Sequence, residues 1–354
     1  MRKLFAAVFI LGAGAAKAEE PLPTIHNIPC QKACANSTGL VPIRETRTLG
    51  RYPSVMKADG DEGFVQFDVK VTEQGDAGEL SLVAVAGPSE MIRATAEAVK
   101  NWKWKPATLE GKPVAVTTLT QMTFRSQMST GARSAVTRAY NQARRHIDDE
   151  LWTEARAVLD EAQASPKLNL YERGMLANIA AQVALKQKDY FEARRASALA
   201  LNHSVDVLPK PVVMGLWRTR IYASIALGDI VGGLDAFDQL KAKRYGDVDA
   251  SIVKFVAEAR AKVVSMPAFG MSARIPRPED AESLFLGLYR PVFTFKDVKG
   301  TLDRFILSCK QQAIESKITD NAEWRIPPNF SECNIRVHGT PGTTFLIVQA
   351  NAPS

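Results

Sequence analysis

The segment from Tyr52 to Phe124 constrains the fold most, because strand-like and helix-like patterns follow one another closely within it. Residues 62–71 alternate with period two, which is typical of a strand with one buried face. The apolar set is Val65, Phe67, Val69 and Val71, and the polar set is Gln66, Asp68 and Lys70. A glycine-containing turn at 74–78 leads to a second strand over 80–85, so the pair predicts a β-hairpin.

A helix follows, with apolar residues at helical spacing from Met91 to Trp102. Pro106 ends this pattern, since proline lacks an N–H and clashes with the preceding turn. Trp102 and Trp104 lie beside the end of the helix, and we expect them in the core rather than on a surface for stacking on bases. A last strand ends at Phe124, which gives the order strand, strand, helix, strand and predicts a two-layer α+β domain.

This order resembles the C-terminal domain of the TonB energy-transducer family. The residues that carry the resemblance are Tyr52-Pro53, Glu62-Gly63, Trp102, Trp104-Lys-Pro106, Gly111-Lys-Pro113-Val114 and Phe124. The resemblance implies a periplasmic domain that adds an extended segment of an outer-membrane receptor to an exposed sheet edge. It would place the partner-binding edge at Val116, Thr117, Thr118, Leu119, Thr120 and Gln121. An ordinary protected edge strand is the alternative for this strand.

The first eighteen residues have the pattern of a secretory signal peptide. A positive start precedes an apolar run from Leu4 to Ala16, and Ala16-Lys17-Ala18 is a typical cleavage site. The run is shorter than the roughly 20 residues that a membrane span needs. We therefore expect a cleaved signal over 1–18, a periplasmic protein without a membrane span after signal removal, and a TonB-like domain with an N-terminal extension over 19–126. Removal of the signal, with Arg2, Lys3 and Lys17, lowers the formal net charge from +7 to +7 − 3 = +4, which is too mild to indicate a nucleic-acid partner.

Four cysteines in an exported chain favour disulfides over metal ligation. The simplest pairing is Cys30 with Cys34 and Cys309 with Cys333, and two other connectivities stay open. A redox-active pair of Cys30 and Cys34 is an alternative, although their spacing is not that of thioredoxin-like sites. His26 near this pair is too little to predict a metal site.

Residues 131–265 predict an α-helical repeat domain of the tetratricopeptide-like class. A large residue precedes a small one by three positions at Trp152–Ala155, Tyr190–Ala193 and Ile230–Gly233, with a period of 38 and then 40 residues. Stacked hairpins of this kind typically offer a concave surface to a partner. A helical spacer between two domains is the alternative.

After a proline-rich segment from Met266 to Pro291, expected to be a linker, strand patterns return. They predict a small β domain over 285–354, with Cys309 and Cys333 on apolar strand faces that would bring them together. Nothing in this segment indicates its role.

The sequence has no recognisable arrangement for catalysis, and we expect no catalytic residues, no cofactor and no metal. The predicted function is protein–protein interaction in the periplasm, with periplasmic or outer-membrane proteins as partners and no small-molecule substrate. A helical-repeat scaffold, in which the TonB-like domain is only a structural module, is the second interpretation. An envelope enzyme or redox protein using Cys30 and Cys34 is the third.

Overall fold

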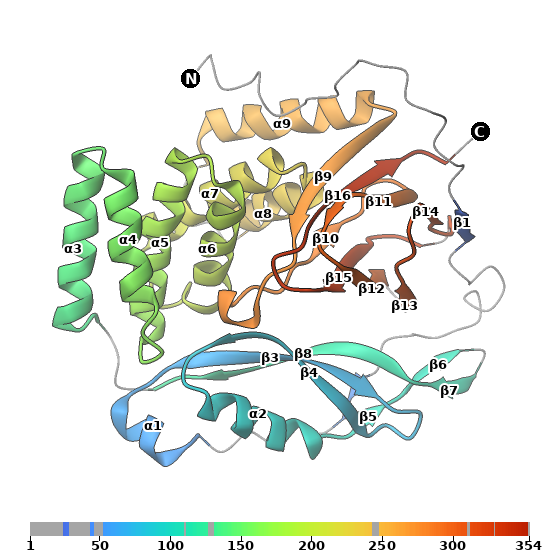
Figure 1. Cartoon of the computed structure of the whole chain (residues 1–354), viewed down its shortest axis with the longest axis horizontal. Helices are drawn as coiled ribbons and strands as arrows, with labels where there is room; N and C mark the ends of the chain where they lie inside the picture. The colour runs from blue at the N-terminus through green and yellow to red at the C-terminus, as the bar shows by residue number, and fades with distance from the viewer. Residues whose placement is uncertain are drawn as a thin grey trace.

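The computed structural model describes residues 24–27, 43–45, 52–109, 111–126, 131–242, 248–309, 312–328 and 330–352. Figure 1 shows three parts, here named the α+β unit (52–126), the helical unit (131–265) and the β sandwich (268–350 with residues 24–27). The α+β unit lies beneath the other two parts in that view. Within the described ranges, no helix is long and apolar enough to cross a membrane.

The α+β unit has the predicted order of elements. Its antiparallel sheet runs β4-β3-β8, formed by β3 (Gly63–Val71), β4 (Ala77–Ala86) and β8 (Val116–Phe124), and helix α2 (Glu90–Lys100) covers one face. The sequence patterns did not indicate several short elements: α1 (Ser54–Asp59), β5 (Trp104–Lys105), β6 (Ala107–Leu109), β7 (Lys112–Val114), and β2 (Ile43–Arg44), which pairs with β5.

Apolar side chains of the sheet and of α2 form the core of the α+β unit. Val65 and Val69 of β3 and Met91 and Val99 of α2 are fully buried there. Trp102 is fully buried and Trp104 is 6% exposed, which confirms the expected core positions of both indoles. Burial of a large aromatic side chain is worth about 1.5–3 kcal/mol, so the two indoles fix the end of α2 against the sheet.

The helical unit contains three hairpins and a further helix. The hairpins are α3 (Ser134–Asp148) with α4 (Trp152–Gln163), α5 (Leu170–Lys186) with α6 (Tyr190–His203), and α7 (Lys210–Ala226) with α8 (Ile230–Ala242); helix α9 (Ala250–Ser265) follows. All three hairpin turns have the same backbone form, with a left-handed residue at Glu150 (φ 59°), Lys188 (φ 60°) and Gly228 (φ 82°). The next residue donates its N–H to a carbonyl near the end of the preceding helix, at 2.7–2.9 Å in the three turns.

The small residues at the start of each second helix are buried, as the repeat pattern predicts. Ala155 and Ala193 are inaccessible, and Gly233 packs where a Cβ atom would lie 2.6 Å from Cγ1 of Ile225. The close approach of the two helices therefore depends on the absence of a larger side chain. The repeated hairpins are present in the structure, and their assignment to the tetratricopeptide class stays a prediction.

The last part of the chain folds as two packed sheets. One sheet runs β1-β14-β11-β16-β9 and the other β10-β15-β12-β13. The strands are β1 (Thr24–Asn27), β9 (Ala268–Arg274), β10 (Leu286–Gly287), β11 (Val292–Lys299), β12 (Leu302–Cys309), β13 (Gln312–Lys317), β14 (Ala322–Arg325), β15 (Asn334–Gly339) and β16 (Thr344–Ala350). Phe293, Phe305 and Trp324 pack together in its core, with ring centroids 5.4–5.7 Å apart.

The linker expectation is wrong for residues 268–274. Strand β9 pairs with β16 along its full length, so the β structure begins before the proline-rich run instead of after it. The prolines at 276 and 278 fall after the strand, next to the short 3₁₀ helix Pro278–Asp280. Strand β1 is a second difference, because it pairs in parallel with β14 and thus places part of the N-terminal extension in the sandwich.

The polar face of β3 is buried, although its alternation predicts a solvent-facing side. Asp68 is 2% exposed and Gln66 is 8% exposed, because β15 and its neighbours in the sandwich cover this face. The Oδ1 atom of Asp68 lies 2.5 Å from Nη1 of Arg336, and Oδ2 lies 3.4 Å from Nε2 of His338. The alternation rule fails here because another domain of the same chain, the β sandwich, covers the polar face of β3. The local sequence pattern does not reveal that contact.

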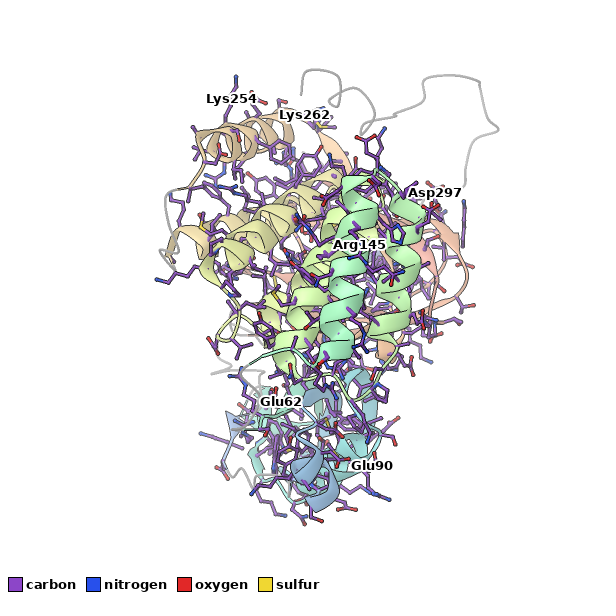
Figure 2. The ribbon with its side chains drawn as sticks, turned by 90° about the vertical axis from the view of Figure 1, so that its left-hand side faces the viewer. Glu62, Glu90, Arg145, Lys254, Lys262 and Asp297 are labelled. Carbon is purple, nitrogen blue, oxygen red and sulfur yellow. A yellow bond between two sulfur atoms is a disulfide. The ribbon has the colours of Figure 1, made fainter. Side chains whose placement is uncertain are left out.

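The helical unit covers the other end of the same face. The ring of Phe64 stacks on His203 of α6, with centroids 3.3 Å apart. Glu62, which lies at the junction of the two parts in Figure 2, accepts N–H bonds from Ser126 (2.7 Å) and from Leu170 (2.9 Å), the first residue of α5. A carboxylate at a helix N-terminus satisfies an otherwise unpaired donor, so Glu62 joins the α+β unit to the helical unit.

We expect Gly233→Ala to destabilise the protein by about 1 kcal/mol, because the new methyl group would overpack against Ile225. Gly215→Ala in α7 is the matched control: its Cβ atom would lie 3.9 Å from the nearest atom, Oδ1 of Asn178. That substitution should stabilise by about 0.5–1 kcal/mol through helix propensity. Urea unfolding followed by circular dichroism measures both, and effects of the same sign would contradict the packing argument.

We also expect acid to weaken the contact between the α+β and helical units. Burial lowers the pKa of His203 from 6.5 to about 3. Because the folded-state pKa is the lower one, neutral His203 stabilises the fold above pH 6.5, and this contribution is lost as the pH falls from 6.5 toward 3. His203→Phe should flatten the pH dependence of the free energy of unfolding in that window, by up to about 1.4 kcal/mol per pH unit.

Urea unfolding at a series of pH values tests this expectation, with His146→Phe on α3 as the control histidine. His338 also has a pKa lowered by burial, to about 4, so His203→Phe should remove only part of the slope. If the free energy of unfolding of His203→Phe depended on pH as strongly as that of the unsubstituted protein, the stacked imidazole would not titrate on unfolding.

Candidate functional site

The six residues of the predicted partner-binding edge lie together on β8. This strand pairs with β3 from Val116 opposite Val71 to Phe124 opposite Gly63, without a bulge. It is the last strand of its sheet, and among the described residues no strand pairs with its other side. An edge strand carries a row of backbone N–H and C=O groups that can pair with another extended chain.

The two faces of β8 have different surroundings. Met122 and Phe124 point into the core beneath α2, and the ring of Tyr52 lies 5.5 Å from that of Phe124. The opposite face turns toward the sandwich, where Gln121 accepts a hydrogen bond from Nε2 of Gln66 at 2.7 Å. One face of β8 thus packs into the core, and on the other face Gln121 bonds to the neighbouring strand β3.

Strand β8 is partly exposed along the predicted edge. Thr120 is buried, and the other five residues have intermediate exposure. The hydroxyl group of Thr117 donates to Oε2 of Glu315 on β13 at 3.0 Å, so the beginning of β8 touches the edge strand of the sandwich. β-Branched threonines favour extended backbone, which suits the strand conformation of this edge.

The turn between β3 and β4 is tied to the segment that follows α2. The N–H of Trp104 donates to the carbonyl of Gly75 at 2.9 Å, and Gly75 has a φ of 82°. A Cβ atom at this position would lie 2.1 Å from the carbonyl oxygen of Trp104, so only glycine fits. The guanidinium group of Arg44 covers the other side of this region, 4.9 Å from the centroid of Trp102.

Tyr52 joins the beginning of the α+β unit to its sheet. Its hydroxyl group donates to the backbone carbonyl of Asp61. Burial and, to a smaller extent, the carboxylates of Glu62 and Asp61 raise the pKa of Tyr52 to about 12. The phenol therefore stays protonated and keeps its role as a hydrogen-bond donor across the physiological range.

Sequence reasoning missed the ion pair that holds the sheet in place. Burial raises the pKa of Asp68, and the adjacent Arg336 guanidinium opposes that rise. Arg336 is 5% exposed and comes from β15, far from Asp68 in the sequence. No local pattern links the two residues, and the only available signal was a carboxylate in the middle of an otherwise strongly strand-like segment.

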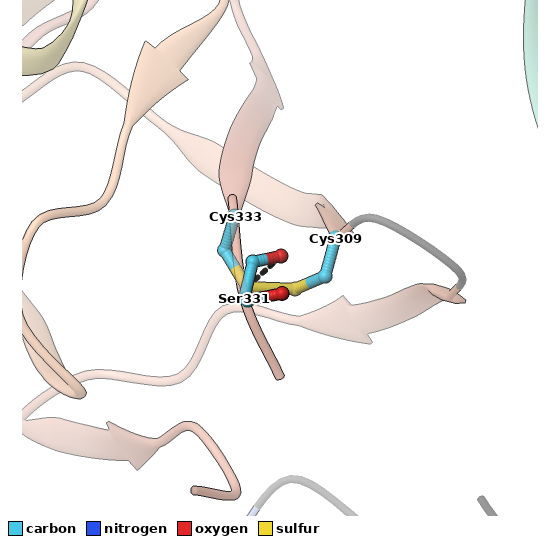
Figure 3. Close-up of a disulfide and its surroundings, with 3 residues drawn as sticks. All are labelled: Cys309, Ser331 and Cys333. Carbon is cyan, nitrogen blue, oxygen red and sulfur yellow. Dashed lines mark hydrogen bonds between the residues drawn. A yellow bond between two sulfur atoms is a disulfide. The ribbon is translucent and has the colours of Figure 1, made fainter. Parts of the chain in front are cut away.

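The structure describes two of the four cysteines, Cys309 and Cys333. A disulfide joins Cys309 at the end of β12 to Cys333 just before β15, and the Cys333 sulfur lies 3.8 Å from the carbonyl oxygen of Ser331 (Figure 3). Cys30 and Cys34 lie outside the described residues, so their pairing stays a prediction. In the part of the chain that the structure describes, no three His, Cys, Asp or Glu side chains form a group that could hold a metal ion.

Comparisons with known proteins bear on this part of the chain. Residues 50–126 match the model of the family described as Gram-negative bacterial TonB protein C-terminal. The Protein TonB of Vibrio cholerae serotype O1 is 31% identical over 96 residues, which are 27% of this chain and 38% of that protein. The chain thus spans less than two fifths of the length of this relative.

A solved structure is similar to a comparable share of this chain. The solution NMR structure of the Pseudomonas aeruginosa TonB CTD has 17% sequence identity and a TM-score of 0.23, covering 29% of this chain and 96% of that one. The assignment of residues 50–126 rests on the sequence matches. These confirm the resemblance expected from the tryptophans, the prolines and the strand order.

We expect Asp68→Ala to destabilise the protein by about 3–5 kcal/mol, because it leaves the Arg336 guanidinium buried without its partner. The double variant Asp68→Ala/Arg336→Met should recover a large part of that loss. Lys70→Ala is the matched control, since Lys70 is on the same strand and face but is exposed. Thermal unfolding of the four proteins gives the test, and a double variant no more stable than Asp68→Ala would contradict a net cost from the unpaired charge.

Proposed function

We propose that this protein is a periplasmic recognition protein that captures an extended segment of another envelope protein along β8. The match of residues 50–126 to the TonB C-terminal family supports a TonB-related envelope protein without enzymatic activity. The observation that carries the proposal is the edge position of β8, with pairing to β3 on one side. Strand addition there would use main-chain hydrogen bonds for affinity and alternate side chains for specificity.

The partner class that fits this mode is an outer-membrane receptor with an extended segment that reaches the periplasm. The residues in contact with it would be Val116, Thr117, Thr118, Leu119, Thr120 and Gln121. Each additional backbone hydrogen bond contributes about 0.5–1.5 kcal/mol net, so a short segment paired along this edge would bind reversibly. The signal peptide expected over residues 1–18 supports this proposal, because its cleavage after export would leave the protein in the same compartment.

A helical-repeat scaffold is the second candidate function. The buried face of β3 favours it, because Asp68 and Phe64 are occupied by contacts within the chain. In this interpretation the α+β unit is a fixed module, and the hairpins of the helical unit hold the partner. The two candidates place the contact on different elements, so one experiment separates them.

Site-specific photocrosslinking in native envelopes tests the proposal. A photoreactive residue at Thr118 should give an adduct with an outer-membrane receptor, whereas one at Lys100 on the exposed side of α2 should not. Adducts from Arg145 on α3 (Figure 2) in the absence of any from Thr118 would favour the scaffold instead. Mass spectrometry identifies the adduct.

Proline substitutions at two successive edge positions sharpen the test. In an edge strand, alternate N–H groups point outward, so Thr118→Pro and Leu119→Pro remove one outward and one inward donor. The substitution at the outward donor should weaken capture about tenfold with little change in thermal stability, and the other should lower stability as well. Undiminished capture by the proline variant that remains folded would rule out pairing along β8.

A further inference from the structure

A cavity of about 590 Å³ lies between the helical unit and the β sandwich, on other elements than the β8 edge. Helices α6, α7 and α8 line one side, and the other side is lined by Phe285, Gly287, Leu288 and residues 332–334. Small-molecule sites typically measure about 300–1,000 Å³, so the cavity has room for a ligand of one or two rings.

The two sides of the cavity are held together by a close contact and a covalent bond. A Cβ atom on Gly287 of β10 would lie 2.2 Å from Cβ of Val231 of α8, so only glycine allows the strand to approach the helix this closely. The Cys309–Cys333 disulfide fixes the sandwich side, since Cys333 is part of the lining. The cavity is therefore formed before any ligand arrives.

The buried charges beside the cavity are balanced within the chain. The guanidinium group of Arg220 interacts electrostatically with Glu282 and with the buried Asp229, and its Nη1 atom donates to the backbone carbonyl of Arg194 at 3.2 Å. Oε1 of Glu282 also lies 3.5 Å from Nε of Arg194. Two cations and two acids compensate one another there, so the buried charges need no counter-ion from a ligand.

Three polar side chains that line the cavity have no hydrogen bond or ion pair within the described part of the chain. Asn202 is near the end of α6, and Asp235 and Gln239 are four positions apart on α8, so the latter two lie on one face of that helix. All three are exposed, so a ligand can reach them. The two amides offer both donors and an acceptor, and the carboxylate offers acceptors.

An aromatic ring lines the other side of the cavity. Phe285 is 40% exposed, although the guanidinium group of Arg336 lies 5.5 Å from the centroid of its ring. The face of an aromatic ring carries partial negative charge and attracts groups with partial positive charge, which include the C–H groups beside the oxygens of a sugar. Phe285 thus offers a stacking surface across the cavity from the polar side chains of α6 and α8.

We propose that this cavity binds a neutral carbohydrate of one or two sugar rings. Each sugar hydroxyl group is both a donor and an acceptor, so neighbouring hydroxyl groups can bond to Asn202, Asp235 and Gln239 together. The C–H face of the same sugar stacks on Phe285. The site is independent of β8, so the full chain would have two ligands of different kinds.

Isothermal titration of the full chain with maltose, cellobiose and N,N′-diacetylchitobiose tests the proposal. We expect saturable binding of at least one of these neutral disaccharides, without competition from inorganic phosphate or from putrescine at equal concentration. No saturable heat with any of the three at millimolar concentrations would overturn it. Competition by phosphate or by putrescine would also contradict it, because either would indicate a site for ions.

Variants of the polar side chains locate the binding. Asp235→Ala and Asn202→Ala should each weaken it about tenfold, because each removes hydrogen bonds to hydroxyl groups of the sugar. Asp238→Ala is the matched control, since Asp238 is exposed on the same helix but is not part of the lining. Equal effects of Asp235→Ala and Asp238→Ala would contradict the assignment.

Substitutions of Phe285 test the stacking surface. Phe285→Tyr should retain binding, and Phe285→Leu should weaken it about fivefold, because leucine stays apolar but has no aromatic face. Unchanged affinity in Phe285→Leu would contradict the stacking. If thermal unfolding shows that Phe285→Leu is unstable, the comparison of Asp235→Ala with Asp238→Ala decides the proposal alone. None of these outcomes changes the crosslinking expected from β8.

Discussion

The ion pair between Asp68 and Arg336 is the constraint on which the arrangement of the three parts depends. Asp68 belongs to the central strand of the α+β unit, and Arg336 belongs to the sandwich. Two charges removed from water stabilise a structure only when their geometry is good, and they penalise every arrangement in which they separate. The pair therefore specifies one placement of the sheet on the sandwich. The same face is also fixed to the helical unit. Glu62 accepts the N–H of Leu170 at the start of α5, and Phe64 stacks on His203. The α+β unit is therefore held by both of its neighbours.

This arrangement has a direct bearing on recognition. A free TonB-like domain could use a sheet face, an edge or a helix for a partner, but here the face is covered by the chain itself. What remains is the outer side of α2 and the edge of β8, and the beginning of that edge touches β13 through Thr117 and Glu315. A segment added to β8 would lie beside the sandwich, and its side chains would meet residues of a second domain as well as those of the sheet. Specificity at such an edge would depend on both domains.

Much of the fold follows from sequence patterns, and the exceptions share one physical cause. Period-two alternation located β3, and helical spacing located α2, although the helix ends at Lys100 and not at Pro106. The recurrence of a large and a small residue located the starts of α4, α6 and α8. Each of these signals is local. The burial of Asp68, the strand β9 in a proline-rich segment and the pairing of β1 with β14 all depend on residues far away in the chain. The candidate edge could be predicted because it belongs to a recognisable domain, whereas the ion pair of Asp68 with Arg336 forms only after two parts of unlike structure have packed.

The parallel pairing of β1 with β14 has a consequence for how the molecule reaches its native state. Thr24 lies opposite Ala322, so nearly the whole polypeptide separates the two strands. Closing a loop of that length has an entropic cost, and contacts between remote segments form slowly. We therefore expect β1 to join the five-stranded sheet after the rest of the sandwich has assembled, with one side of β14 open until then. During that interval the protein has an exposed template for association with other chains, which makes the late strand a point where assistance by a chaperone would matter.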